Sequence, residues 1–298
     1  MPITALAGCS SSDATAIEPS QNGEAGTLAD GAPATAEDGG GTTPKDDAGN
    51  PALGPVRFKI QIDYRFDTAG FFADQARKDA LEGACRIWGR LLSDSFPDVP
   101  KGTYVKVRDP QKPTEPAEAL TLDYDIDDLV VFVGSSDLPP NVTGIASPTA
   151  GLSGVTDDTL RTSLQQRFDG AAFQPWTGWI SFDSGAAFHF DPQPELDAPV
   201  PSGKVDFVSV ALHEIGHVLG FGTADAFNGK ITGTAFTGAK TSALNGGPLQ
   251  LTSDLGHAPN TTMSGGTRLL MDQSDAPGTR YLPTPLDRAV FEDLGFHF

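Results

Sequence analysis

One short run, residues 205–220, constrains the fold of this chain more than any other part of the sequence. Residues 205–212 are almost wholly apolar and long enough to form a buried helix. They lead directly into His213 and His217, which are four residues apart. On a helix, residues at this spacing lie about one turn apart on the same face, so both imidazoles point the same way. Gly220 follows where such a helix would end.

Glu214, next to the first histidine, indicates what chemistry this run supports. Two imidazoles on one helix face can bind one metal ion, and Glu214 would then lie beside the water that the ion binds, as a general base. The simpler alternative is a buried amphipathic helix with two incidental histidines. That alternative leaves a carboxylate beside a core face without a reason. The run therefore predicts a metal site, and zinc is the metal expected.

A catalytic zinc usually has three protein ligands and one open position, so the third ligand must come from elsewhere. The chain has five histidines: His189, His213, His217, His257 and His297. His257 is the best candidate, because it lies in the turn-rich stretch 253–259, which could return to the site. A carboxylate remains an alternative third ligand, at Asp225, Asp254 or Glu292. We expect ordinary roles for His189, in an edge strand or loop, and for His297, near the C-terminus.

The order of motifs from residue 200 to residue 296 resembles a known family. The compact metzincin pattern, His-Glu-x-x-His-x-x-Gly-x-x-His, would place the third histidine at Thr223, so that pattern is broken here. The run Leu269-Leu270-Met271-Asp272 resembles the metzincin Met-turn, and residues 285–296 predict a closing helix. The chain therefore resembles a bacterial, matrixin-like or leishmanolysin-like metzincin with an insertion before the third histidine.

This resemblance implies a zinc-dependent endopeptidase that hydrolyses peptide bonds with zinc-activated water. It implies His213, His217 and His257 as metal ligands, Glu214 as general base, and Met271 beneath the metal. Met271 could instead be ordinary core, and Met263 is a rival for the Met-turn. The tyrosine that sometimes follows the Met-turn is not evident, and Tyr281 is only a remote substitute.

Metzincins bind substrate as an extended strand along the edge of a sheet. By resemblance, the candidate for that edge is the segment containing Trp179, Ile180 and Ser181, because it lies upstream of the active-site helix. The expected fold class is α/β (α+β): a metzincin-like zincin with a twisted mixed sheet, an active-site helix, and a C-terminal helix after the Met-turn. Hydrophobic patterning predicts strands at 56–64, 104–107, 129–133 and 179–183, and a helix within 71–92. Residues between the last two strands are expected to be largely loop.

The first 54 residues predict a separate organisation. The run Leu6-Ala7-Gly8-Cys9 resembles a bacterial lipobox, so residues 1–9 are expected to be the remnant of a lipoprotein-type signal, with a lipid anchor through Cys9. Residues 10–54 are acidic and have almost no large apolar side chains, which predicts a disordered tether. Residues 55–298 are the expected catalytic domain. This organisation implies an extracytoplasmic protein, either secreted or lipid-anchored at the bacterial surface or in the periplasm.

Charge and cysteine content narrow the possible partners. The net charge of −19 argues against nucleic acid and anionic membrane as partners. With only two cysteines, Cys9 and Cys85, the fold does not depend on disulfides, and Cys85 is expected to be buried. Structural calcium is common in related families. A cluster of four carboxylates could bind Ca²⁺, but its spacing fits no full calcium-loop pattern and a solvated acidic turn explains it better: Asp123, Asp125, Asp127 and Asp128.

Several functions stay open at this point. The leading one is an endopeptidase, a monomer acting on a protein or peptide. A non-catalytic protein-binding module on the same scaffold is an alternative, but Glu214 would then have no use. A narrow-specificity processing peptidase is another, and the sequence does not separate it from a digestive enzyme.

Overall fold

A mixed six-stranded sheet organises the chain in the computed structural model, which describes residues 7–11, 53–149, 151–152, 155–169, 172–196 and 198–298. Its strand order is β15-β1-β6-β7-β5-β2. The strands are β1 (Ala7–Ser11), β2 (Ile60–Asp63), β5 (Leu129–Ser136), β6 (Val142–Pro148), β7 (Thr177–Asp183) and β15 (Ser274–Asp275). Strands β2, β5 and β7 run parallel, whereas β6 is antiparallel to β7 and to β1. The expected α/β class with a mixed sheet is confirmed.

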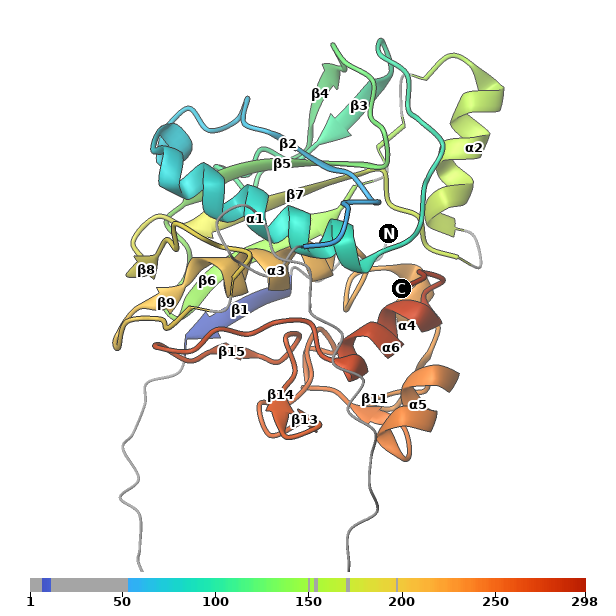
Figure 1. Ribbon diagram of the computed structural model, residues 1–298. Helices are drawn as coiled ribbons and strands as arrows, with labels where there is room; N and C mark the ends of the chain where they lie inside the picture. The colour runs from blue at the N-terminus through green and yellow to red at the C-terminus, as the bar shows by residue number, and fades with distance from the viewer. Residues whose placement is uncertain (1–6, 12–52, 150, 153–154, 170–171, 197) are drawn as a thin grey trace, which may run out of the picture. The chain divides into compact units, whose positions relative to one another are not determined.

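The two faces of this sheet bury different cores. Along β5, Leu129, Val131 and Val133 join the core that contains the long helices, while Val130 and Phe132 join a second core. This alternation follows from the period of two along a strand. The second core lies under the hairpin of β3 (Tyr104–Val107) and β4 (Glu118–Thr121), at the top of Figure 1. Because both faces are covered, the first five residues of β5, Leu129–Val133, are all apolar.

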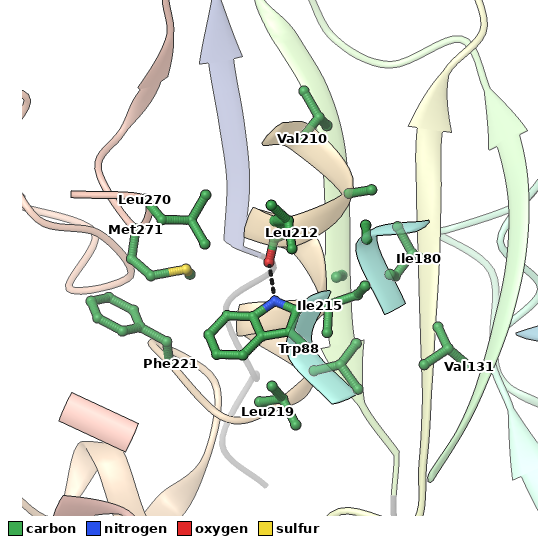
Figure 2. Close-up of a cluster of buried hydrophobic side chains, with 14 of the residues drawn as sticks. Trp88, Val131, Ile180, Val210, Leu212, Ile215, Leu219, Phe221, Leu270 and Met271 are labelled. Atoms are coloured by element: carbon green, nitrogen blue, oxygen red, sulfur yellow. Dashed lines mark hydrogen bonds between the residues drawn. The ribbon is translucent and has the colours of Figure 1, made fainter. Parts of the chain in front are cut away.

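Two helices fill the other face of the sheet. Helix α1 (Gln75–Leu91) follows a short 3₁₀ turn, η1 (Phe71–Ala73), and packs against α3 (Phe207–Val218). Trp88 on α1 is fully buried, and its indole N–H donates to the carbonyl of Leu212 on α3, 3.0 Å away (Figure 2). Helix α3 is buried along its whole length, as the apolar run predicts. The motif helix is therefore held inside the molecule.

The C-terminal part lies on the opposite side of α3 from the β3–β4 hairpin and consists of short elements (Figure 1). It contains α4 (Asp225–Asn228), β10 (Ile231–Thr232), β11 (Ala235–Phe236), α5 (Ala239–Asn245), β12 (Leu249–Gln250), β13 (Met263–Ser264), β14 (Thr267–Arg268) and α6 (Pro285–Asp293). The small strands β8 (Phe188–His189) and β9 (Val205–Asp206) pair just before α3. Among the described residues, no helix is long and apolar enough to cross a membrane.

The expectation that residues 134–178 are largely loop was wrong. Strand β6 lies there, and its apolar residues are interrupted by Gly, Ser, Thr and Pro, so pairing with β7 decides its conformation rather than its own pattern. Helix α2 (Asp158–Asp169) also lies there. Leu160, Leu164 and Phe168 recur at helical spacing, and this signal was available in the sequence.

The prediction that Trp179, Ile180 and Ser181 form an edge strand was also wrong. These residues belong to β7, which pairs with β5 on one side and with β6 on the other. Trp179, Ile180 and Ser181 are all buried. A strand paired on both sides has no free backbone groups to offer a peptide. The antiparallel strand beyond β7 is β6, and its outer side is paired with β1.

The N-terminal residues bear on the predicted domain boundaries. The chain divides into two units, Met1–Asp13 with Val56–Phe298, and Ala14–Pro55. The predicted boundary between residues 9 and 10 falls inside β1, which belongs to the first unit. The lipid anchor at Cys9 stays a prediction. Residues 12–52 lie outside the described part, so the predicted tether also stays a prediction.

Trp88 gives a stability test of the α1–α3 contact. Trp88→Ala should lower the free energy of unfolding by about 3–5 kcal/mol, because it leaves a cavity between the two helices. Trp88→Phe keeps an aromatic ring in place but loses the hydrogen bond to Leu212. Its free energy of unfolding should therefore fall by about 1 kcal/mol. Urea unfolding followed by circular dichroism measures both. An equal loss of unfolding free energy in the two variants would contradict the packing role of the Trp88 ring.

Candidate metal centre

Helix α3 begins at a well-fixed N-terminus. Asp206 is the N-cap residue, and its carboxylate accepts from the backbone N–H of Ser209 at 3.0 Å. The guanidinium of Arg280 pairs with the same carboxylate at 2.8 Å. Both side chains of this pair are buried. The start of the helix is thus tied to the segment that precedes α6, which sets the position of the histidines two turns further on.

Three imidazoles meet at one point. The Nε2 atoms of His213 and His217 are 2.9 Å apart, and those of His217 and His257 are 3.2 Å apart. All three side chains are buried. His257 comes from the loop between β12 and β13, forty residues beyond His217. Among the described residues, these three form the group close enough to hold a metal ion, as the sequence predicts for His257.

The outer nitrogen of each ring has its own partner. The Nδ1 atom of His213 lies 2.8 Å from the carbonyl oxygen of Leu270, and that of His217 lies 2.8 Å from the carbonyl oxygen of Phe221. The Nδ1 atom of His257 lies 3.1 Å from a carboxylate oxygen of Asp254. Because these oxygens only accept, each Nδ1 carries the proton. Each Nε2 then presents a lone pair to the shared point.

Three converging lone pairs repel one another unless a cation lies between them. Tetrahedral zinc with Zn–N bonds of about 2.0–2.1 Å would separate its nitrogens by about 3.3 Å. The separations of 2.9 and 3.2 Å are close to this value. The donor set therefore fits a metal ion, and imidazole donors suit zinc among several transition metals.

Burial keeps the rings in the form that binds metal. It lowers the pKa of His213 to about 3, with a further contribution from His257. Burial, with His213 and His257, also holds the pKa of His217 well below its ordinary value. Neutral imidazole is the ligand form, so no protons need to be displaced from these two Nε2 atoms at neutral pH.

Glu214 is the most unusual residue of the site. Its side chain is fully buried, and neither carboxylate oxygen has a hydrogen-bond partner in the part of the chain that the structure describes. Burial, together with the charge of Asp275, raises its pKa well above the ordinary value. A buried, unpartnered carboxylate costs free energy, so it calls for a functional reason.

The backbone of β6 passes directly over this carboxylate. A Cβ atom added at Gly144 would lie 2.7 Å from Oε1 of Glu214, closer than real Cβ contacts. Gly144 therefore allows strand β6 and the Glu214 side chain to approach each other. The site is bounded by this strand on one side and by α3 on the other.

Met271 lies beneath the histidine pair. A Cβ atom on Gly216, between the two histidines on α3, would lie 2.5 Å from the Met271 sulfur. Asp287 on α6 holds this turn by accepting from the backbone N–H groups of Leu270 at 3.0 Å and Met271 at 3.1 Å. The rival Met263 is 51% exposed in the β13–β14 hairpin, so Met271 is the methionine at the centre.

Asp287 is a residue that sequence reasoning missed. It completes a capping box with Thr284 at the start of α6, and the pattern Thr-Pro-Leu-Asp carried that signal. Burial raises its pKa. Its contact with Leu270 matters to the centre, because the Leu270 carbonyl orients His213. Asp287 is thus a structural link between the closing helix and a ligand.

The alternative third ligands have other contacts. Glu292 pairs with Lys240 at 3.4 Å on the far side of α6. Asp225 starts α4, and Asp254 contacts the outer nitrogen of His257 rather than the shared point. Thr223, where the compact pattern would have a histidine, donates to the His217 carbonyl.

The other residues singled out from the sequence have ordinary positions. His189 lies in β8, and His297 contacts Asp94 at 2.8 Å. Cys85 is buried and free. The four carboxylates considered for calcium do not converge: Asp123 pairs with Arg65, Asp127 with Lys59, Asp125 accepts from the Lys101 N–H, and Asp128 from the N–H groups of Lys59 and Phe96.

A cavity of about 1160 Å³ lies beside Asp254, the residue that contacts His257. Asp254, the partner of His257, lines one side, and Val142 and Ile145 of β6 line another. Residues 111–116, Glu118 and residues 136–139 complete its wall. This volume could hold several side chains of an extended peptide.

Comparison with protein-family models and with curated proteins finds no match to this chain. The functional interpretation therefore depends on the geometry of the centre.

Asp254 offers a test of the metal centre that does not depend on activity. Asp254→Ala removes the acceptor that orients His257, so Zn²⁺ affinity should fall about 10- to 100-fold. Asp254→Asn keeps an acceptor in place, so its Zn²⁺ affinity should fall less. Competition with a zinc-binding dye measures both. Unchanged affinity in Asp254→Ala would mean that Asp254 does not orient His257 toward the metal.

Proposed function

We propose that this chain is a zinc-dependent endopeptidase, with Zn²⁺ held by His213, His217 and His257. The observation that carries the proposal is the unpartnered, fully buried Glu214 beside three converging imidazole nitrogens. A purely structural metal site would be closed by a fourth protein ligand. A non-catalytic binding module would keep no use for an uncompensated buried carboxylate.

The roles of the residues follow from this arrangement. When bound, zinc supplies a Lewis acid that polarises the peptide carbonyl and lowers the pKa of water to about 7. Glu214 takes a proton from the attacking water and returns it to the leaving amine nitrogen as the C–N bond breaks. Met271 supports the ligands from below without contacting substrate.

Glu214→Gln tests the assigned base. The variant keeps the shape of the side chain but cannot accept a proton, so peptide cleavage should fall at least about 100-fold. The zinc-loaded full chain and the variant would be incubated with a diverse peptide mixture, and new termini mapped by mass spectrometry. Zinc content, measured in parallel, should stay the same. Full turnover by Glu214→Gln would exclude Glu214 as the base.

Gly144→Ala tests the close approach between β6 and Glu214. The added methyl group would collide with the Glu214 carboxylate and displace it, so cleavage should fall about 10- to 100-fold while zinc remains bound. Ser147→Ala, on the same strand, is a matched control, because it adds no atom near Glu214. Equal activity of Gly144→Ala and the parent would contradict the contact.

A further inference from the structure

The cavity beside Asp254 carries an excess of negative charge. Its lining holds four carboxylates and one ammonium group, a formal net charge of −3: Glu115, Glu118, Asp137 and Asp254, with Lys112. The Lys112 ammonium group is already engaged, since it lies 3.2 Å from a carboxylate oxygen of Asp109 and 4.0 Å from one of Glu118. Among the described residues, the carboxylates of Glu115 and Asp137 form no hydrogen bond or ion pair. The lining therefore leaves carboxylate charge that no side chain of the described part neutralises.

These carboxylates are spread along a cavity rather than gathered around one point. In the part of the chain that the structure describes, the group close enough to hold a metal ion is the three histidines, not these acids. A solvated acidic surface would by itself point to no ligand. Here, however, the same cavity has an apolar side, formed by Leu138, Val142 and Ile145. Apolar surface and carboxylates together match a long aliphatic side chain that ends in a cation.

Both walls of the cavity are held in place by hydrogen bonds. The guanidinium of Arg108 donates to two backbone carbonyls of the segment 111–116, at 2.8 and 2.6 Å. On the other wall, the backbone N–H of Leu138 donates to the carboxylate of Asp183, at the end of β7, at 3.2 Å. The cavity is thus formed before a ligand enters, which lowers the ordering cost of binding.

Two contacts connect this cavity to the candidate centre. Asp254 lines the cavity and also lies 3.1 Å from the Nδ1 atom of His257. The cavity is lined as well by two residues of β6, the strand on which Gly144 approaches the Glu214 carboxylate. A peptide whose cleaved bond lies at the centre would therefore place a neighbouring side chain in the cavity.

We propose that the cavity selects peptides with an arginine or lysine side chain close to the cleaved bond. This inference rests on the proposed function and names its substrate class. The aliphatic stem of either side chain packs on the apolar side of the cavity, and its cationic group lies among the carboxylates. Glu115 and Asp137 decide the preference, because their carboxylates have no other partner among the described residues. An acidic concave surface also concentrates cationic peptides near the centre.

Matched peptides test this preference on the zinc-loaded full chain. In a diverse peptide mixture, the new termini mapped by mass spectrometry should be enriched in arginine or lysine at one position near the cut. The best-cut sequence is then made with lysine, norleucine or glutamate at that position, since norleucine keeps the aliphatic stem of lysine without its charge. The lysine peptide should have a kcat/KM at least about tenfold above that of the norleucine peptide. Added salt should narrow this difference, because it screens the attraction.

A double variant assigns the preference to the cavity. Glu115→Gln with Asp137→Asn removes two charges and keeps the size of both side chains, and both residues are exposed, so the fold should not change. The ratio of lysine to norleucine cleavage should fall at least about fivefold. Asp79→Asn with Asp98→Asn is the matched control, because it removes two charges at exposed positions outside the cavity. This control should keep the ratio of the parent.

The outcomes separate this inference from the endopeptidase function. Cleavage without a preference for arginine or lysine would overturn the role of the cavity, and so would a preference that the double variant leaves unchanged. If no peptide is cleaved, fluorescence anisotropy measures the binding of labelled alanine-rich peptides with a central lysine or norleucine. Tighter binding of the lysine peptide, lost in the double variant, would mean that the endopeptidase function fails while the preference of the cavity stands. Equal binding of the two peptides would overturn both.

Discussion

The complete burial of helix α3 is the constraint on which the rest of this structure depends. Burial removes water from His213, Glu214 and His217 together, and this desolvation acts on them in opposite directions. It disfavours the charged imidazoles, which leaves neutral ligands, and it disfavours the charged carboxylate, which raises the proton affinity of the base. One packing arrangement thus sets the protonation of the three-histidine group and of the proposed base together.

The parts that surround α3 hold it from several directions. Trp88 on α1 contacts its backbone at Leu212, and Arg280 holds the N-cap Asp206. From the C-terminal side, Asp287 holds the turn whose Leu270 carbonyl orients His213. Each of these polar side chains is buried and has a partner, so each contributes a defined position as well as free energy. The candidate centre is therefore positioned by residues far in sequence from His213 and His217.

The outer side of strand β6 is paired rather than open. A peptide-binding edge needs free backbone groups, yet an open edge also invites pairing with other chains. In this chain β1 covers the edge, and Gly144 lets the edge approach Glu214.

The sequence by itself determined the elements with strong local signals. These are α3, where an apolar run and the spacing of His213 and His217 coincide, and β5, which begins with five consecutive apolar residues. His257 could be predicted as the third candidate ligand because the chain has few histidines. Only the tertiary structure, however, brings His257 next to His213 and His217. The tertiary structure also decided that β6, not β7, lies next to the site, since strand order depends on long-range pairing. Local patterns specify which residues are buried, whereas backbone hydrogen bonds between distant segments specify which strand is the edge.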